Sequence, residues 1–353
     1  MRHLILGSAL LALGLAACND DALSPSSTDV ETLDLSRYTG SENGKTGKTP
    51  GILGFASYEG HLFVPLQRLG ADWKPLDTSL VLEIDPATRQ VVREIRLPLA
   101  NPYSMKLVGS KLVLACVGAW TDDSYANVLD GGVVSVDLAT GTTEILAREA
   151  DLGGNVSDAL LVGSKLYVAV STMWPNTHVA VIQGGSIVDS LPGVTLAGGL
   201  QAAGANLLVA MRESSPYVAI FDPAKDSMIG KIATGIEPTS MEVFDGGRLA
   251  VLGTNYTVRL GALMVADSVK KGAKASTSKG FETSNIGMSI ADDVVYVLNR
   301  DLGTVTGFRH GDREQVVLDW NVGSQSNPYD VAVLGSELWA ACYNLSALQI
   351  RKP

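Results

Sequence analysis

Apolar and polar positions along this chain repeat one phrase. The phrase is an apolar strand, a tight turn of glycine and polar residues, and a second apolar strand. Seven copies share the turn and the second strand: Glu59–Val64, Leu107–Ala115, Leu161–Ala169, Gly204–Val209, Gly246–Val251, Asp292–Val297 and Val333–Ala341. Repetition at a fixed period indicates an array of equivalent structural units rather than one irregular fold.

The spacing of the copies identifies the kind of unit. The apolar residue that opens each second strand recurs at Leu62, Leu112, Leu166, Leu207, Leu249, Val295 and Leu338. The steps between these residues are 50, 54, 41, 42, 46 and 43 positions, about the length of a β-propeller blade. The second strands are nearly continuous apolar runs, which is typical of strands buried on both faces.

Each unit contains two further strands. A third apolar strand ends in Asp before a turn, as in Leu80–Asp85 and Val133–Asp137, and Asp favours such turns because its side chain bonds nearby backbone. A fourth strand, such as Val91–Leu97, alternates apolar and charged residues as an outer edge should. The pattern therefore predicts an all-β, seven-bladed β-propeller of four-stranded antiparallel blades. A pair of β-sandwiches or a β-solenoid is the alternative.

The last unit is one strand short. It ends at Pro353 after three strands, Asp330–Val333, Leu338–Cys342 and Ala347–Arg351. We expect Val30–Leu35 to supply the missing outer strand, because an N-terminal strand that completes the last blade protects the open edges of the ring. The predicted propeller domain is 30–353.

The N-terminal segment predicts export and lipidation. Residues 1–17 combine a positive Arg2 with an apolar run too short to span a membrane, and Leu15-Ala16-Ala17-Cys18 resembles the lipobox of bacterial lipoproteins. We expect cleavage before Cys18, palmitate and other acyl chains on Cys18, and a flexible tether over 18–29. An ordinary secretory signal peptide with a chance Cys is the alternative. Asn19 after the Cys favours the outer membrane over inner-membrane retention.

The repeat resembles the seven-bladed propellers of the YVTN and quinoprotein-like type. Leu166–Val170 (LYVAV) and Val295–Asn299 (VYVLN) are closest to the core motif of that group, and the resemblance extends over about residues 30–353. It implies a lipoprotein of the bacterial cell envelope, periplasmic or surface-facing. Some propeller lipoproteins of this type capture cobalamin or another nutrient for an outer-membrane transporter. Others are lactonase-like or quinoprotein-like enzymes, so the resemblance leaves function open.

Composition narrows the class of partner. The chain has 353 residues with 27 Lys+Arg and 37 Asp+Glu, which gives 27 − 37 = −10, and 46% of its residues are hydrophobic. The apolar fraction is enough for a large core. The acidic balance disfavours nucleic acid, which requires a basic surface. We therefore expect the partners to be the membrane, through the lipid, and a small molecule, a glycan or an envelope protein.

The residues that usually carry catalysis are scattered. His61, His178 and His310 fall in blades 1, 3 and 6: in a turn between first and second strands, at the start of a third strand, and in a turn between third and fourth strands. They therefore predict neither a metal centre nor a catalytic triad. Cys116 and Cys342 share a register position two blades apart, which predicts buried free thiols. We expect no catalytic residues, no metal and no cofactor, and hence a non-catalytic protein.

Two loops invite a nucleotide or metal interpretation. Gly44–Thr49 (GKTGKT) suggests a P-loop, but it lacks the required glycine spacing and the strand–loop–helix context, which favours a mobile connection. Asp122–Asp130 is acidic enough to bind calcium but lacks the spacing of a known calcium loop. Calcium binding and a solvated loop both remain open there.

Aromatic residues form the most informative pattern. Loops after second and fourth strands emerge on the same face of a propeller, and loops of this kind carry a set of aromatic residues: Trp73, Trp120, Trp174, Tyr103 and Tyr329. Trp120 and Trp174 lie eight residues after Leu112 and Leu166, and each Tyr follows an Asn-Pro pair. The five residues predict a ligand-binding sector across blades 7, 1, 2 and 3. The alternative is that each Trp caps its own blade and that Asn-Pro-Tyr is turn chemistry.

The enzyme alternative makes a separate prediction. Four charged residues directly follow second strands and would line the central funnel: Arg212, Glu213, Arg300 and Asp301. A lactonase-like or quinoprotein-like enzyme would require such groups to converge.

Overall fold

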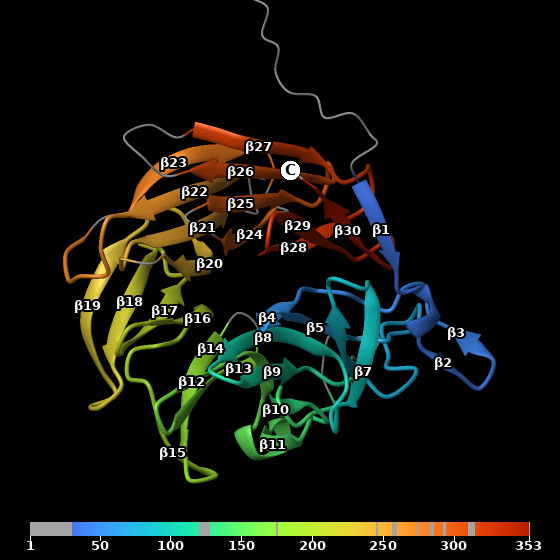
Figure 1. Cartoon of the computed structure of the whole chain (residues 1–353). Helices are drawn as coiled ribbons and strands as arrows, with labels where there is room; N and C mark the ends of the chain where they lie inside the picture. Colours follow the sequence, from blue (N-terminus) through green and yellow to red (C-terminus); the bar gives the residue numbers. More distant parts are fainter. Residues whose placement is uncertain are drawn as a thin grey trace, which may run out of the picture.

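Seven four-stranded antiparallel sheets are arranged in a ring in a computed structural model of the chain (Figure 1). The structure describes residues 30–352, apart from 120–127, 174–175, 256–259, 284–285, 292–293, 310–314 and the single residues 245, 274 and 282. The predicted all-β, seven-bladed propeller of four-stranded blades is therefore confirmed.

The strands follow the predicted order, from the innermost to the outermost in each blade. Blade 1 contains β4 (Ala56–Tyr58), β5 (His61–Leu66), β6 (Leu80–Asp85) and β7 (Gln90–Arg96), and blade 2 contains β8 (Pro102–Val108), β9 (Lys111–Cys116), β10 (Gly132–Asp137) and β11 (Thr143–Arg148). Blade 3 contains β12 (Asn155–Val162), β13 (Lys165–Met173), β14 (Asn176–Gln183) and β15 (Ser186–Ser190), and blade 4 contains β16 (Ala197–Ala203), β17 (Asn206–Met211), β18 (Tyr217–Asp222) and β19 (Ser227–Ala233). Blade 5 contains β20 (Pro238–Val243), β21 (Leu249–Asn255), β22 (Leu260–Ala266) and β23 (Ser276–Phe281), and blade 6 contains β24 (Ile286–Ala291), β25 (Val294–Asn299), β26 (Thr304–Arg309) and β27 (Gln315–Asn321). Blade 7 contains β28 (Pro328–Leu334), β29 (Glu337–Cys342), β30 (Ala347–Arg351) and β1 (Val30–Asp34).

The N-terminal strand closes the ring, as predicted. Strand β1 pairs antiparallel with β30, with Val30 opposite Arg351 and Asp34 opposite Ala347. Directly after the strand, the Leu35 amide donates to the Ser346 carbonyl at 2.8 Å. Leu35 is 1% exposed and packs between blades 7 and 1. The strand itself is mostly exposed, so backbone pairing and Leu35 together hold the closure.

One arginine of blade 1 joins three parts of this closure. The Arg89 guanidinium lies 4.8 Å from the ring centre of Trp339 in β29, and its Nη2 donates to Glu337 Oε1 at 2.7 Å. Its Nε reaches Glu31 Oε1 of β1 at 3.3 Å. Hydrogen bonding to Glu337 raises the pKa of Arg89 and lowers that of Glu337, so the pair stays charged.

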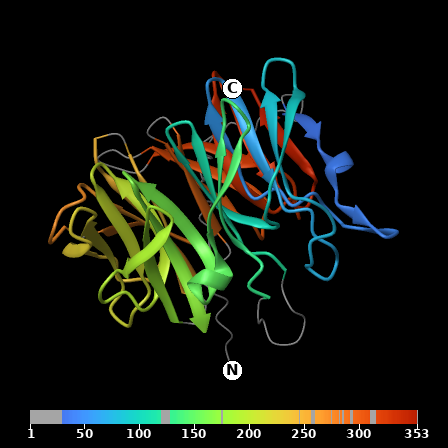
Figure 2. The same cartoon turned by 90° about the horizontal axis from the view of Figure 1, so that it is seen from below.

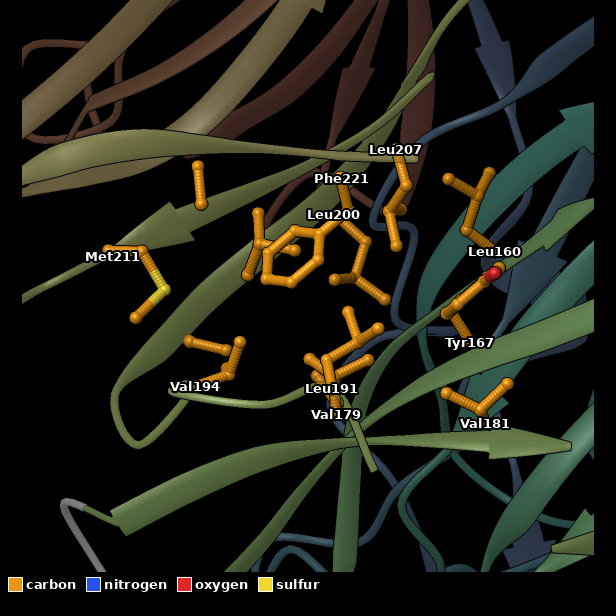
Figure 3. Packing of buried hydrophobic residues seen from close by; sticks show 14 of the residues in the cluster. Leu160, Tyr167, Val179, Val181, Leu191, Val194, Leu200, Leu207, Met211 and Phe221 are labelled. Carbon is orange, nitrogen blue, oxygen red and sulfur yellow. The ribbon is translucent and has the colours of Figure 1, made fainter. Parts of the chain in front are cut away.

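Hydrophobic clusters lie between neighbouring blades. Figure 3 shows the cluster where Tyr167 and Val181 of blade 3 face Leu200 and Phe221 of blade 4. Equivalent clusters fill the other junctions, and they contain the apolar residues of the second and third strands. These strands read as continuous apolar runs because a neighbouring blade covers each of their faces.

Two connections contain structure that the sequence did not predict. The segment expected to be a mobile loop includes a hairpin of β2 (Ser41–Glu42) and β3 (Lys45–Thr46), turned by Asn43 and Gly44 with φ of 50° and 77°. A 3-10 helix, η2 (Ser36–Tyr38), precedes this hairpin. An Asn-Gly pair favours such tight turns because both residues tolerate positive φ.

The second connection is α1 (Glu149–Leu152), between blades 2 and 3. The Glu149 side chain is fully buried, and its carboxylate accepts the amides of Gly131 at 3.1 Å and Val156 at 2.8 Å. Burial raises the pKa of Glu149 against these hydrogen bonds. One short helix and one buried acid therefore fix the spacing of the two blades.

Cys116 and Cys342 are buried free thiols, as predicted. Burial raises the pKa of the Cys342 thiol to about 12, and it raises that of Cys116 as well. Both thiols therefore stay protonated and unreactive near neutral pH. Among the described residues, no helix has the length and apolar character needed to cross a membrane.

Candidate functional site

At the centre of the ring, residues of blades 1, 2, 5, 6 and 7 line a cavity, which we call the funnel. Figure 1 views the ring along its axis, and Figure 2 shows it from the edge, with the strands running between two faces. Loops after second and fourth strands lie on one of them, the loop face, and the tight turns lie on the other, the turn face. The funnel has a volume of about 360 Å³, and most of its lining residues belong to the first halves of β8, β20, β24 and β28. Innermost strands begin at the loop face, so the funnel lies at that face.

β-Bulges shape the rim of the funnel. The strand pairing shifts register between Pro102 and Ser104 in β8 and between Pro328 and Asp330 in β28, which leaves Tyr103 and Tyr329 as the extra residues. The same shift occurs between Pro238 and Ser240 in β20. A bulge changes the direction of a side chain at the rim of a sheet. The repeated Asn-Pro-Tyr motif thus contains a β-bulge, which places both tyrosines in the funnel lining.

The aromatic residues divide into three groups. Tyr103 is 56% exposed and Tyr329 is half-buried, and both line the funnel. Trp73 is 60% exposed at the tip of its loop and lies outside the funnel lining, so it does not cap its own blade. Trp120 and Trp174 lie outside the described residues. The five-residue sector remains a prediction, of which the structure brings two members to one cavity.

Three carboxylates lie on the innermost strands of blades 3, 5 and 7, and two of them, Glu242 and Asp330, line the funnel. Asp158 of β12 accepts the Ser104 hydroxyl and, at 2.8 Å, the Leu200 amide. Asp330 of β28 accepts the Phe55 amide at 3.1 Å. Both acids are therefore held by hydrogen bonds from a neighbouring blade.

Glu242 of β20 belongs to a different network. Its Oε2 accepts Gln201 Nε2 at 3.3 Å, and Gln201 Oε1 accepts Lys106 Nζ at 3.2 Å. The network spans the ring from blade 2 through blade 4 to blade 5 without any direct ion pair between Lys106 and Glu242 in the described structure.

Burial raises the pKa of the two acids in the funnel lining, Glu242 and Asp330. It raises the pKa of Asp330 to about 7, against hydrogen bonds that favour the charged form and with a further contribution from Glu242. Burial also raises the pKa of Glu242, while Lys106 lowers it and Asp158 raises it. The acids are close enough to influence one another, so the charge of the funnel changes near neutral pH.

Arg300 is the cation in the funnel lining. Its guanidinium lies 4.0 Å from the ring centre of Tyr329, and its Nε is buried without a hydrogen-bond partner. Its Nη2 lies 3.0 Å from where a Cβ on Gly287 would be, so a side chain at Gly287 would displace it. Of the four charged residues predicted to line the funnel, only Arg300 does so. Arg212 lies against Gly198, and Asp301 accepts the Thr283 hydroxyl at 2.6 Å.

The sequence contained a signal for the acids that its analysis missed. Asp158 and Asp330 each lie eight residues before the apolar residue that opens the next strand, Leu166 and Leu338. Ser104 lies eight residues before Leu112. These positions carry polar side chains in an otherwise apolar phrase, and the repeat places them at one level around the axis.

The remaining candidates stay apart. His61 lies in β5, where its Nδ1 is 2.5 Å from Glu83 Oε1, and His178 lies in β14, far along the ring. His310 lies outside the described residues. Among the residues that are described, no three His, Cys, Asp or Glu side chains could hold one metal ion.

The acidic loop Asp122–Asp130, for which the sequence leaves calcium binding open, is only partly described. Asp130 Oδ1 accepts the Ala119 amide at 2.9 Å and so fastens the two ends of the loop. Residues 122–127 lie outside the described structure, so calcium binding there stays open.

Replacing Asp330 by Asn should change how stability depends on pH. Between about pH 4 and pH 7 the folded wild type binds the Asp330 proton and the unfolded chain does not, so wild-type stability falls as pH rises. Asp330→Asn lacks this proton, so between pH 5 and pH 8 its unfolding free energy should rise relative to wild type by about 2 kcal/mol. This corresponds to a relative rise of a few degrees in the thermal midpoint. Asp189→Asn on exposed β15 is the control. Parallel pH profiles for Asp330→Asn and wild type would contradict the assignment.

Comparison with known proteins identifies the fold and nothing narrower. No protein-family model and no curated protein sequence matches the chain. Hydrazine synthase of Kuenenia stuttgartiensis is similar in structure, with a TM-score of 0.60 and 15% identity over 86% of this chain and 96% of that chain. The Cps50 (Swd1) β-propeller domain of Myceliophteria thermophila has a TM-score of 0.61 and 15% identity over 86% and 97%. The computationally designed Ika8 protein has a TM-score of 0.57 and 10% identity over 89% and 99%. At these identities the likeness is one of β-propeller architecture alone.

Proposed function

We propose that this protein is a lipid-anchored, non-catalytic binding protein of the bacterial cell envelope that holds a small polar ligand in its funnel. The observation that carries this proposal is a cavity of about 360 Å³ whose lining joins aromatic rings, at Tyr103 and Tyr329, with charged groups. Ligand sites typically measure about 300–1,000 Å³ and combine apolar surface with a few placed polar groups.

The size of the funnel limits the ligand. A cavity of about 360 Å³ is at the small end for a ligand site. A cobalamin-like macrocycle, which the resemblance to YVTN-type propeller lipoproteins suggests, would rest on the rim rather than enter. A compact polar nutrient fits the enclosed volume better, and Trp73 and Tyr103 extend the surface available to a larger one.

The position of the closing strand supports an orientation. Strand β1 begins opposite Arg351, where β30 ends, and third strands end at the turn face. The tether therefore joins the propeller on the side away from the funnel. A tether of residues 18–29 spans at most about 40 Å when extended. An anchor at Cys18 would leave the funnel open to the solvent side.

A binding experiment tests the proposal. Purified chain beginning at Thr28 is incubated with cell-envelope extract, and bound small molecules are identified by mass spectrometry. Ser240→Trp places a bulky ring in the funnel lining and should abolish recovery of the ligand. Ser186→Trp on exposed β15 is the matched control and should retain the ligand. Equal recovery with both variants would place the ligand elsewhere.

Substitution of the loop aromatics tests the wider sector. Trp73→Ala should change the free energy of unfolding by less than about 0.5 kcal/mol, because the ring is exposed. If the ring is a binding hot spot, the same substitution should weaken binding of the ligand isolated from the extract by about 2 kcal/mol. The measurement pairs thermal midpoint and affinity, and it applies equally to Trp120→Ala and Trp174→Ala. Lost stability with unchanged affinity in all three variants would contradict the sector.

An enzyme of lactonase-like or quinoprotein-like type is the second candidate. It is favoured by one observation, the pKa of Asp330 at about 7 in the funnel lining, because a general acid or base works best when its pKa is near the working pH. If the isolated ligand is converted to product by wild type and only bound by Asp330→Asn, the enzyme candidate replaces the binding protein.

A further inference from the structure

The funnel contains a cation and two acids that do not pair with each other. Arg300, Glu242 and Asp330 all contribute to its lining. In the described part of the chain, no Lys, Arg or His nitrogen lies within 4.0 Å of a carboxylate oxygen of Glu242 or Asp330, and no carboxylate lies that close to Arg300. Charges that share one cavity normally pair, because unpaired charges away from water are costly.

The chain itself holds these groups apart. Arg300 lies against the Tyr329 ring at 4.0 Å, in space left by Gly287. Asp330 is fixed by the amides of Phe55 and Val331, at 3.1 and 2.8 Å, over the open backbone of Gly54. Stacking fixes the cation and backbone amides fix the anion, so neither side chain is free to reach the other. A site whose charges are held in advance binds without a large ordering cost.

Both kinds of charge have unused hydrogen-bonding capacity. The Arg300 Nε is buried and has no partner. Glu242 Oε2 accepts Gln201, whereas no donor to its Oε1 is found in the described structure. The guanidinium can donate to an anion, and the carboxylate can accept from a cation with N–H groups.

A single metal ion does not fit this arrangement. A metal needs several ligands within about 2.0–2.6 Å of one point, and the described residues contain no group of three His, Cys, Asp or Glu that meets this need. The charges are spread around a cavity of about 360 Å³ instead. The complementary ligand is therefore an organic molecule that carries separated charges.

We infer that the funnel binds a small zwitterion of the free amino-acid class, with its ammonium group at Glu242 and Asp330 and its carboxylate at Arg300. The inference rests on the proposed binding function and names its ligand class. An ammonium group supplies N–H donors to Glu242 Oε1, for which the described structure shows no donor, and a carboxylate matches the planar donors of a guanidinium. Tyr103, exposed at the rim, is placed to contact the side chain of the ligand.

The test uses matched analogues at pH 8. The twenty free α-amino acids are screened against the chain beginning at Thr28 by thermal shift, and the tightest is titrated by calorimetry beside its N-acetyl and amide derivatives. We expect each derivative, which lacks one charge, to bind at least tenfold more weakly than the parent.

Charge-removing variants then assign each end of the ligand. Glu242→Gln should weaken the parent at least tenfold but leave the weak N-acetyl derivative unchanged, and Arg300→Met should weaken the parent but not the amide. Glu144→Gln and Arg309→Met are matched exposed controls, which should bind like wild type. This pattern is not expected from a general loss of fold.

The outcomes separate the two proposals. Equal binding of the parent and both derivatives overturns the zwitterion, as does a screen without a hit when Ser240→Trp still abolishes recovery of an extract ligand. In the second case the binding function stands with another ligand class. If no amino acid binds and no ligand is recovered from extract, both proposals fail.

Discussion

A chain that begins at Thr28 is expected to unfold at the same temperature as the chain that begins at Cys18, whereas a chain that begins at Ser36 should unfold about 10 °C lower or aggregate. The first truncation removes only residues that precede β1. The second removes β1 (Val30–Asp34) and Leu35, and so removes the outer strand of blade 7.

Three losses add up to this effect. Leu35 is 1% exposed, and losing such a buried side chain costs about 2–5 kcal/mol. The backbone hydrogen bonds between β1 and β30 contribute about 1 kcal/mol each. Arg89 also loses its contact with Glu31. An uncovered β30 is then an exposed edge, which can pair with another chain.

Two controls keep the prediction interpretable. Leu35→Ala in the longer chain should reproduce part of the loss. Thr32→Ala on exposed β1 removes only the exposed hydrogen bond that Gln349 Nε2 donates to Thr32 Oγ1 at 3.0 Å, and should cost much less. A synthetic peptide with the sequence of residues 30–35, added to the shorter chain, should restore part of its thermal midpoint. Equal midpoints for the chains that begin at Thr28 and Ser36 would show that β1 does not close the ring.

The fold was predictable from the sequence because its information is local. Each blade requires only a turn and apolar strands within about 45 residues, and Leu107–Ala115 and Leu161–Ala169 show that phrase almost unchanged. The closing strand was predictable for a similar reason, since a seventh unit with three strands requires a fourth. Short features with no periodicity were missed, such as α1, which depends on the single buried side chain of Glu149.

The funnel was only partly predictable because its lining comes from different blades. Asn-Pro-Tyr drew attention to Tyr103 and Tyr329 because it occurs twice, but its bulges become visible only in strand pairing. No repeated motif marks Glu242, and its hydrogen bond comes from Gln201 in the neighbouring blade. Arg300 and Arg212 both follow second strands, so the sequence predicts the same position for both, and only the structure shows that Arg300 lines the funnel and Arg212 does not.

Proteins that share this fold at 10–15% identity include a chain of hydrazine synthase and a computationally designed protein. Architecture therefore places no limit on what the funnel binds. Most residues of the funnel lining belong to the innermost strands β8, β20, β24 and β28, and Arg300 directly follows the second strand β25. The pairing of Arg300 with Tyr329, rather than with an acid, is a property of this chain's own sequence.

The proposed lipid anchor makes the location of the protein depend on one residue, Cys18. Cys18→Ser is expected to abolish incorporation of labelled palmitate, to leave unprocessed precursor, and to move the mature domain out of the membrane fraction. The reason is chemical, because acyl chains on Cys18 anchor through about 0.8 kcal/mol per buried CH₂ and no serine hydroxyl replaces the thiol in that modification. The label and the cell fraction are measured in the same cells.

The matched control is Cys116→Ser, which changes a buried thiol of the propeller and should leave labelling intact. Asn19→Asp then tests sorting. In an enterobacterial host an Asp directly after the Cys retains lipoproteins in the inner membrane, so this variant should shift the protein from the outer to the inner membrane fraction. Palmitate incorporated into Cys18→Ser would contradict lipidation at this site.

Because β1 joins the tether at the turn face, a lipidated chain should also expose the loop face to a membrane-impermeant reagent in spheroplasts or on whole cells. Labelling at a cysteine introduced at Tyr103, but not at one introduced beside the tether, would place the funnel away from the membrane.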